Sequence, residues 1–284
     1  MSIPVEVVNG KFAGPRLWLS AALHGDEVNG VEIVRELLAR IEPDTLCGAV
    51  IAVPTVNVFG FINGSRYLPD RRDLNRSFPG SKKGSLAARL ARLFLEEIVT
   101  QSTHGIDLHT GAVGRYNHPH IRGNLNDPET RRIAAAFGAP VMMSAPAPVG
   151  SLRHTAANRG IPILLFEGGE AQRFDSYPVA VGLAGIQRVM DELGMYRHTP
   201  APVSHDLLES KTSTWLRAKR AGILRLAFES GDFVKKKQLL GTIGDVFERE
   251  VIKISAPFDG IILSHVTHPL VHQGDAILHI AQLS

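Results

Sequence analysis

The sequence predicts an α/β protein that ends in a small all-β region, and two observations lead to this prediction. From residue 17 to residue 193, short apolar runs alternate with segments in which apolar residues recur at helical spacing. After Tyr196 the pattern changes to short runs interrupted by glycines, which is typical of a small β-barrel or sandwich. Strands that alternate with helices build helical layers around a sheet, so we predict an α/β/α sandwich with a mixed central sheet.

The elements of the first part follow from their apolar patterns. Strands are expected where continuous apolar runs occur, at residues 17–23, 50–53, 105–109 and 161–166. Helices are expected where the apolar period is helical, at residues 28–41, 86–99, 127–137 and 179–193. Gly194 follows the last of these helices at a position typical of a helix end.

The C-terminal region has its own organisation. Residues 197–204 contain two prolines and are predicted to form a linker, which divides the chain into domains at 1–198 and 199–284. Ser-Gly-Asp-Phe-Val at 230–234 and Gln-Gly-Asp-Ala-Ile at 273–277 suggest a pseudo-repeat that resembles a lipoyl-type barrel-sandwich module. Lys253 lies inside a predicted strand without flanking methionines, so we do not expect it to carry lipoyl or biotin.

Composition excludes several classes of function. The net charge of +3 is small and Lys and Arg are spread along the chain, which argues against a nucleic-acid partner. Cys47 is the one cysteine, so the chain has neither an internal disulfide nor a cysteine-rich metal site. We see no signal-peptide pattern and no apolar run near the ~20 residues that span a bilayer. We therefore expect a soluble cytoplasmic protein with no membrane partner.

A first candidate site follows the strand predicted at 17–23. In Leu23-His-Gly-Asp-Glu27, His24 and Glu27 are three positions apart, so their side chains can turn to one point. Imidazole nitrogen and carboxylate oxygen are both zinc ligands, and a catalytic zinc typically has three protein ligands and one open position. The alternative is a loop histidine near an unrelated carboxylate at a helix start.

A second histidine, His109, closes the strand predicted at 105–109, at the same edge of the sheet. Asp107 lies two residues earlier and could orient the site, because ligand histidines usually donate their other N–H to an acceptor. The alternative for this motif is a histidine whose hydrogen bonds are satisfied within a turn.

Two polar segments suit a substrate that bears a carboxylate. Ser65-Arg66-Tyr67 and Asp73-Leu-Asn-Arg76 supply guanidinium groups, which bind carboxylates through paired hydrogen bonds. The alternative is a solvated polar loop, which is what we expect of Arg71 and Arg72.

A carboxylate follows the last predicted strand of this part, in Ile163-Leu-Leu-Phe-Glu167-Gly-Gly-Glu170. Partial desolvation of Glu167 at the sheet edge would raise its pKa, which suits general acid/base catalysis. Glu170 is the competitor, but it is expected beyond the strand and in solvent. His118 and His120 either line the pocket or replace a ligand, whereas His265, His268 and His272 are expected on a polar β edge.

Taken in order, the motifs His-Gly-Asp-Glu, Asp-Leu-Asn-Arg and Asp-Leu-His-Thr resemble those of the succinylglutamate desuccinylase/aspartoacylase family. The resemblance covers roughly residues 17 to 170 and implies a zinc-carboxypeptidase-like fold that binds one Zn²⁺ per chain. Carried over by motif, it implies zinc ligands at His24, Glu27 and His109, an acid/base at Glu167, a carbonyl-polarising Arg66, and a substrate-carboxylate clamp at Asn75 and Arg76.

The resemblance implies hydrolysis of the amide bond of a small N-acylated amino acid, with an acetyl or succinyl acyl group. The alternatives are a metallocarboxypeptidase that acts on short peptides and a non-catalytic module that binds a ligand. No tyrosine lies in the C-terminal region, and neither Arg153 nor Arg159 matches the spacing of the family's second substrate arginine, so N-acetylaspartate is not the expected substrate. The expected partner is a small carboxylate-bearing molecule, and the sequence is compatible with a homo-oligomer.

Overall fold

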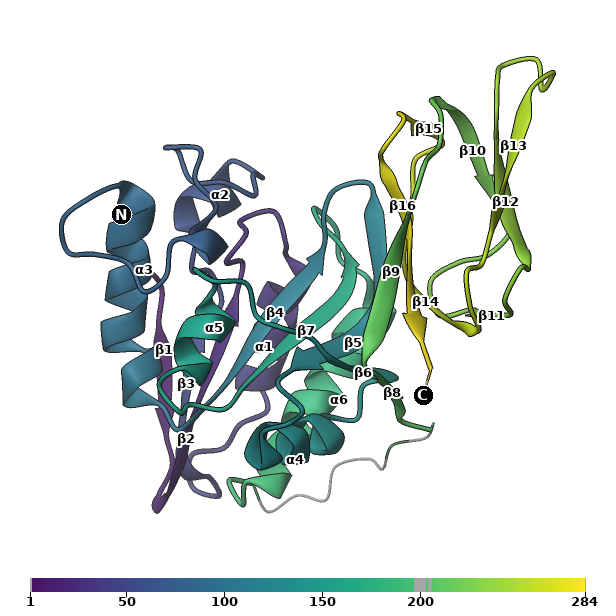
Figure 1. Ribbon diagram of the computed structural model, residues 1–284. Helices are drawn as coiled ribbons and strands as arrows, with labels where there is room; N and C mark the ends of the chain where they lie inside the picture. The colour runs from purple at the N-terminus through teal and green to yellow at the C-terminus, as the bar shows by residue number, and fades with distance from the viewer. Residues whose placement is uncertain (1, 197–202, 204–205, 284) are drawn as a thin grey trace.

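The computed structural model describes residues 2–196, 203 and 206–283. A large mixed sheet runs through the molecule, with helices around its first half, and the described C-terminal residues form strands but no helix (Figure 1). The predicted domain boundary between residues 198 and 199, and most of the predicted linker, lie outside the described residues. The α/β fold with a mixed sheet is confirmed.

The large sheet has the strand order β1-β3-β2-β4-β7-β5-β14-β16-β9, and β6, β8 and β11 pair beside this path. Its strands up to residue 170 are β1 (Glu6–Asn9), β2 (Phe12–Ala21), β3 (Cys47–Val53), β4 (His104–Gly111), β5 (Arg115–Gly123), β6 (Val141–Ser144) and β7 (Ile163–Glu170). The central strands β3, β2, β4 and β7 are parallel, whereas β5 runs antiparallel to β7. The carboxyl ends of β2, β4 and β7 therefore meet at one edge.

Helices cover both faces of this sheet because its central strands are apolar on both sides. In β2, Leu17 and Leu19 join one buried cluster and Trp18 joins the other, as expected when successive side chains point to opposite faces. One face packs against α1 (Asn29–Leu38), α4 (Pro128–Phe137) and α6 (Ser176–Glu192). The other packs against α3 (Leu86–Glu97) and α5 (Leu152–Ala157), and the short helices are α2 (Val58–Ile62), η1 (Leu74–Arg76) and η2 (Val99–Gln101).

The described part of the C-terminal region contains only strands, arranged in two sheets around a separate hydrophobic core. The strands in the large sheet are β8 (Leu208–Ser210), β9 (Thr212–Arg217), β11 (Phe233–Val234), β14 (Gly260–Val266) and β16 (Ala276–Gln282). The smaller sheet contains β10 (Gly222–Leu226), β12 (Leu239–Gly244), β13 (Val251–Ser255) and β15 (Leu270–Val271). The pairing of β14 with β5 makes the large sheet continuous between the two regions.

The segments that sequence patterns identified are present with shifted ends. The helix predicted at 179–193 begins at Ser176, and Gly194 follows it with a left-handed φ of 68°. The strand predicted at 161–166 extends to Glu170, so both candidate glutamates lie within β7. The sequence did not predict β5, because Pro119, two histidines and two arginines interrupt its pattern. Pro119 falls where the register between β5 and β7 shifts, which is where a sheet tolerates proline.

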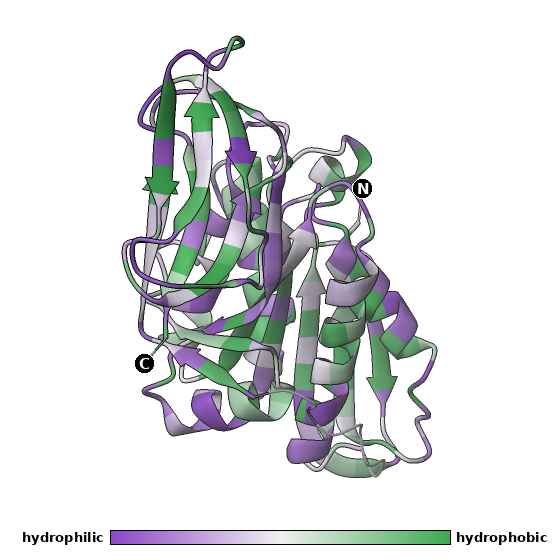
Figure 2. Cartoon of the chain, turned by 90° about the vertical axis from the view of Figure 1, so that its right-hand side faces the viewer, coloured by the Kyte–Doolittle hydropathy of each residue, from purple (hydrophilic) through white to green (hydrophobic). Residues whose placement is uncertain are grey.

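Hydrophobic residues recur along the strands, and the helices carry both hydrophobic and hydrophilic residues (Figure 2). Within the described residues, none of the helices combines the length and apolar character needed to cross a bilayer.

Candidate active site

A polar cavity of about 270 Å³ opens at the carboxyl ends of β4 and β7. Two rows of neighbouring residues cross β4, β7 and β5, and all of their members except the buried Asp107 line this cavity. The first row is His109, Glu167 and His120, and the second is Asp107, Leu165 and Arg122. Because register partners point to the same face of a sheet, three strands direct their polar side chains into one space.

The turn after β2 directs His24 and Glu27 toward this cavity. Ala22 has a positive φ of 46°, which is rare for a residue other than glycine and turns the chain out of the strand. At Gly25 a β-carbon would lie 2.1 Å from the backbone of Gly60, so only glycine allows the two segments to pack this closely. The His-Gly-Asp-Glu motif therefore has a structural requirement at its second position.

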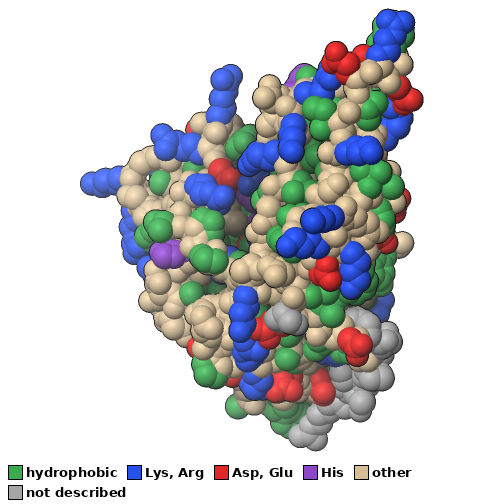
Figure 3. All heavy atoms as spheres, turned by 45° about the vertical axis from the view of Figure 1, so that its right-hand side comes forward, with side chains coloured by type: hydrophobic (Ala, Val, Ile, Leu, Met, Phe, Trp, Pro, Cys, Tyr) green, Lys and Arg blue, Asp and Glu red, His purple; other side chains and the backbone are tan. Residues whose placement is uncertain are grey.

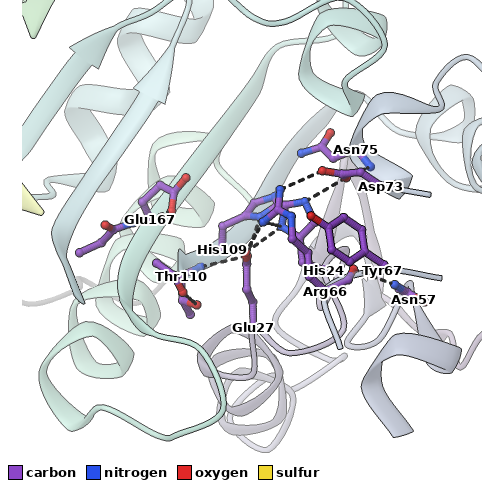
Figure 4. A network of polar contacts seen from close by, with 12 residues as sticks. His24, Glu27, Asn57, Arg66, Tyr67, Asp73, Asn75, His109, Thr110 and Glu167 are labelled. Atoms are coloured by element: carbon purple, nitrogen blue, oxygen red, sulfur yellow. Dashed lines mark hydrogen bonds and ion pairs between the residues drawn. The ribbon is translucent and has the colours of Figure 1, made fainter. Parts of the chain in front are cut away.

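His24, Glu27 and His109 form one compact buried group. One ligand atom from each lies within 4.8 Å of the others. Nδ1 of His24 lies 2.7 Å from Oε1 of Glu27, and Nδ1 of His109 lies 2.7 Å from Oε2 of the same carboxylate (Figure 4). The three residues predicted as ligands therefore converge, and each histidine points its Nδ1 atom toward the carboxylate of Glu27.

The opposite nitrogen of each imidazole also faces a carboxylate. Nε2 of His109 lies 2.8 Å from Asp107, which in turn accepts a hydrogen bond from Ser20 at 2.7 Å. Nε2 of His24 lies 3.2 Å from Asp73. The contact between Asp107 and His109 has the geometry that the predicted orienting role requires. Asp73 makes the same kind of contact with His24, although the sequence analysis gave it no such role.

The donor set of this group fits a divalent metal. Each ring lies between two carboxylates, and an ionised carboxylate accepts hydrogen bonds but does not donate them. Burial alone would lower the pKa of His109, but Asp107 and Glu27 raise it well above its usual value. Burial would raise the pKa of Glu27, but the two imidazoles lower it overall. The surrounding carboxylates favour positive charge at this group. Protonation of both imidazoles or one bound divalent cation would supply that charge.

Arg66 and Asp73 border this group. Nη2 of Arg66 donates to Asp73 at 2.9 Å, and its Nη1 donates to Glu27 at 3.4 Å. The buried Asn75 accepts a hydrogen bond from the Leu152 amide at 2.9 Å through its side-chain oxygen. Arg76 is exposed and lines the same cavity. The name metal wall is used below for five residues, His24, Glu27, Asp73, Asp107 and His109.

Glu167 lies beside this wall, on the side away from Asp73 (Figure 4). Its Oε2 accepts a hydrogen bond from Asn117 Nδ2 at 2.9 Å. Burial raises the pKa of Glu167, although the nearby His109 and Arg122 lower it in part. A carboxylate with a raised pKa, next to a candidate metal group, is suited to accept and return a proton.

The competitor Glu170 is not solvated, so that prediction was wrong. Only 8% of Glu170 is exposed, and its Oε1 accepts hydrogen bonds from the Gly114 amide at 2.7 Å and from Thr267 at 3.2 Å. The extension of β7 buries Glu170, and it does not line the cavity. Its role is to join β7 to the turns beside it.

The cavity is also lined by residues that the sequence did not identify as a group. We call Arg115, Arg122, Arg153, Trp215 and His279 the cationic wall. The indole of Trp215 stacks on His279 with ring centroids 4.3 Å apart, and the guanidinium of Arg115 lies 4.6 Å from its ring centroid. The C-terminal region therefore supplies part of the cavity, through β9 and β16.

One signal for this wall is present in the sequence. Polar residues alternate along this segment, at Arg115 and Asn117 and again at His120 and Arg122. The alternation shifts by one residue between the two pairs, where Pro119 lies. His120 lines the cavity, as one of its two predicted roles requires, and burial lowers its pKa well below the usual value. Among the described residues, His24, Glu27 and His109 are the one group that could hold a metal, so His120, His265, His268 and His272 do not form another.

Known proteins resemble this chain over most of its length. A model of the succinylglutamate desuccinylase/aspartoacylase catalytic domain matches residues 13–193. The N-alpha-acetyl-L-2,4-diaminobutyric acid deacetylase of Halomonas elongata is 30% identical over 307 residues, which cover 99% of this chain and 86% of that protein.

Solved structures show the same fold. A succinylglutamate desuccinylase/aspartoacylase from Rhodobacter sphaeroides has a TM-score of 0.89 at 27% identity, over 99% of this chain and 90% of that one. The product-bound ectoine utilization protein EutE (DoeB) of Ruegeria pomeroyi has a TM-score of 0.89 at 23% identity, over 98% and 88% of the two chains.

Proposed function

We propose a zinc-dependent amide hydrolase for this chain, which belongs to the succinylglutamate desuccinylase/aspartoacylase family. Its substrate is a small N-acylated amino acid with an acetyl or succinyl group, and it binds one zinc ion per chain. The observation that carries the proposal is the buried group of His24, Glu27 and His109 in the same cavity as Glu167. The cavity volume of about 270 Å³ favours a small molecule over a peptide.

His24, Glu27 and His109 would hold the zinc, which when bound polarises the scissile carbonyl and makes a water molecule more acidic. Asp73 and Asp107 keep the two imidazoles in the orientation that directs Nδ1 inward.

The remaining steps are assigned to the chain's own side chains. Glu167 takes a proton from the attacking water as the oxygen–carbon bond forms, and gives it to the leaving nitrogen as the carbon–nitrogen bond breaks. Arg66 donates hydrogen bonds to the carbonyl oxygen as negative charge develops there, a contribution of roughly 3 kcal/mol for one donor. Asn75 and Arg76 bind the substrate carboxylate and so fix the position of the amide.

The same proposal covers the finer description of the fold. Helices on both faces of the mixed sheet support a carboxypeptidase-like catalytic domain at 1–198. Two sheets around a separate core support a barrel-sandwich domain at 199–284.

Metal analysis and a substrate panel test the proposal. Protein purified without chelator should contain about one zinc per chain and should release acetate or succinate from N-acyl amino acids. The panel begins with N-acetyl-2,4-diaminobutyrate, the substrate for which the Halomonas relative is named. It continues with N-acetyl and N-succinyl derivatives of neutral and acidic amino acids, and with short peptides. Failure to take up zinc, or activity on peptides alone, would contradict the proposal.

A further inference from the structure

An apolar groove lies between α3 and the segment that leads into β1, at the end of the molecule opposite the C-terminal strands (Figure 1). Its volume is about 450 Å³, and it shares no lining residue with the candidate active site. Apolar side chains line most of it, and two of them are half exposed, Val5 at 45% and Leu93 at 49%. A single exposed apolar residue is ordinary on a protein surface, but a continuous apolar groove marks a site of interaction.

The exposed side of α3 carries a regular series of residues along this groove. Arg89, Leu93 and Glu97 follow one another at intervals of four residues, and all three are exposed. Residues four apart lie one turn apart on the same side of a helix. Leu93 is therefore midway between a positive and a negative charge, each about 6 Å away along the helix axis.

Neither charge of this series has an ion-pair partner among the described residues. The neighbouring Arg92 does have one, since its Nε donates to Glu96 at 2.8 Å, and Lys82 also lies 3.6 Å from Glu96. Arg89 and Glu97 are two helix turns apart, too far to be neighbours on the helix surface. An ion pair for either of them would therefore come from another molecule.

The series is complementary to itself. If two copies of α3 pack antiparallel about a two-fold axis at Leu93, Arg89 of each copy meets Glu97 of the partner subunit. The two Leu93 side chains then lie together at the centre, in the apolar grooves. In a two-fold dimer both subunits use the same patch and every contact occurs twice, so a self-complementary patch favours a second copy over an unrelated partner.

We propose that this chain forms a two-fold dimer through the groove, with its α3 helices antiparallel and two ion pairs between Arg89 and Glu97. Burial of Val5 and Leu93 supplies the apolar centre of the interface, and the ion pairs at its rim fix the direction of the helices. The groove and the active site have no lining residue in common, so both active sites stay open in the dimer. The dimer does not depend on the reaction that the chain catalyses.

Sedimentation velocity at about 0.1–100 μM tests whether the chain dimerises, because this range covers the affinities expected of a small specific interface. The wild type should approach twice the chain's 30.8 kDa as its concentration rises. Leu93→Asp should raise the dissociation constant of the dimer at least ~10-fold, because it places a charge in an apolar contact. Val246→Asp changes an exposed apolar residue in the C-terminal region and should leave the dimer intact. Circular dichroism checks that both variants are folded.

Exchanging the charges tests the antiparallel arrangement. Arg89→Glu or Glu97→Arg alone places like charges opposite each other twice in the dimer, and each should weaken it about 10–100-fold. An equimolar mixture of the two variants should form a heterodimer, because both of its ion pairs then join opposite charges. The double variant Arg89→Glu/Glu97→Arg should restore the homodimer for the same reason. Lys219→Glu, the same change at an exposed residue outside the groove, should have no effect.

Three results would overturn the proposal. A wild type that stays monomeric up to ~100 μM would leave the groove to a partner of another kind. A dimer that Leu93→Asp does not weaken would use another face of the molecule. If the two charge variants failed to associate when mixed, the helices would not pack antiparallel through these charges.

Discussion

The metal wall and the cationic wall face the same cavity but balance their charges differently. On the metal wall the two imidazoles lie between three carboxylates, each at a distance of 2.7–3.2 Å. On the cationic wall the arginines contact carbonyl oxygens, an indole ring and one carboxylate at 4.0 Å. Lys and Arg side chains also gather around the hollow on this face of the molecule (Figure 3).

The difference separates two uses of buried polar groups. A network whose members all have partners holds its side chains in one geometry, which a metal site requires. A charge that lacks a close partner is costly unless a ligand supplies one. We therefore expect changes on the metal wall to affect chemistry on every substrate, and changes on the cationic wall to depend on the charge of the substrate.

The largest effect is expected from His109→Ala, which removes one of the three proposed zinc ligands. Zinc content should fall well below one per chain, and activity should fall to background because two protein ligands do not hold the ion tightly. Elemental analysis and turnover measure both. His104→Ala is the matched control, since His104 begins the same strand but contacts Thr103 and Glu129. Full zinc content in His109→Ala would show that His109 is not a zinc ligand.

Glu167→Gln should lower kcat by ~10²–10⁴-fold while zinc stays bound, because an amide cannot accept the proton. Glu170→Gln is the control, since Glu170 lies in the same strand but outside the cavity. If Glu170→Gln lost turnover and Glu167→Gln did not, the acid/base would be assigned to the wrong glutamate.

The pH profile sharpens this prediction. Burial raises the pKa of Glu167, and a general base acts in its ionised form. The kcat/KM of wild type should therefore rise with pH through a value above the usual pKa of glutamate, and be lost as pH falls below it. This limb should be absent in Glu167→Gln, and its persistence there would assign it to another group.

Asp107→Asn should have a smaller effect that falls on metal affinity. Changes to groups that orient ligand histidines typically weaken metal binding by about 10–100-fold. Competition with a chelator would measure the zinc dissociation constant. Asp127→Asn is the control, because Asp127 caps α4 away from the cavity. Unchanged zinc affinity would show that the contact between His109 and Asp107 serves packing alone.

The smallest effect is expected from Arg76→Ala, because Arg76 is exposed. Loss of a carboxylate contact made in both ground and transition states should raise KM by about 10-fold with little change in kcat. Arg76→Lys should also have a raised KM, since the point charge of lysine cannot reproduce the paired hydrogen bonds of arginine. Substrates with an amidated α-carboxylate should be nearly insensitive to Arg76→Ala, and Arg72→Ala is an exposed control. Equal losses on the acid and the amide would show that Arg76 does not read the carboxylate.

The sequence predicted the metal wall better than the cationic wall for a physical reason. His24, Glu27 and His109 follow apolar strands with clear patterns, and strand ends at one sheet edge meet in space. Most of the cationic wall lies on elements with weak patterns. Arg115 and Arg122 lie on β5, where Pro119 hides the alternation, and Arg153 lies on α5, a helix of six residues.

The contribution of the C-terminal region could not be read from local patterns. Trp215 and His279 are neighbours because β9 and β16 pair in register, a contact between segments far apart along the chain. The overall α/β class followed from the alternation of strand and helix patterns along the chain. The path of the sheet into the C-terminal strands depends instead on long-range pairing between β5 and β14. Pairing of that kind has no signature within a short window of sequence.

The split pairing of β5 has a consequence for how the chain can be divided. Its outer edge is covered at Arg115–Asn117 by β14 and at His120–Gly123 by β6, which itself pairs with β8. A fragment ending at residue 196 would lack β8 and β14 and would present unpaired N–H and C=O groups on β5 and β6. It would also uncover Val141 and Met143, which in the full chain pack against Ile261, Leu263 and Ala281. Exposed strand edges of this kind recruit other chains, so the shortened protein should self-associate rather than behave as an independent catalytic unit.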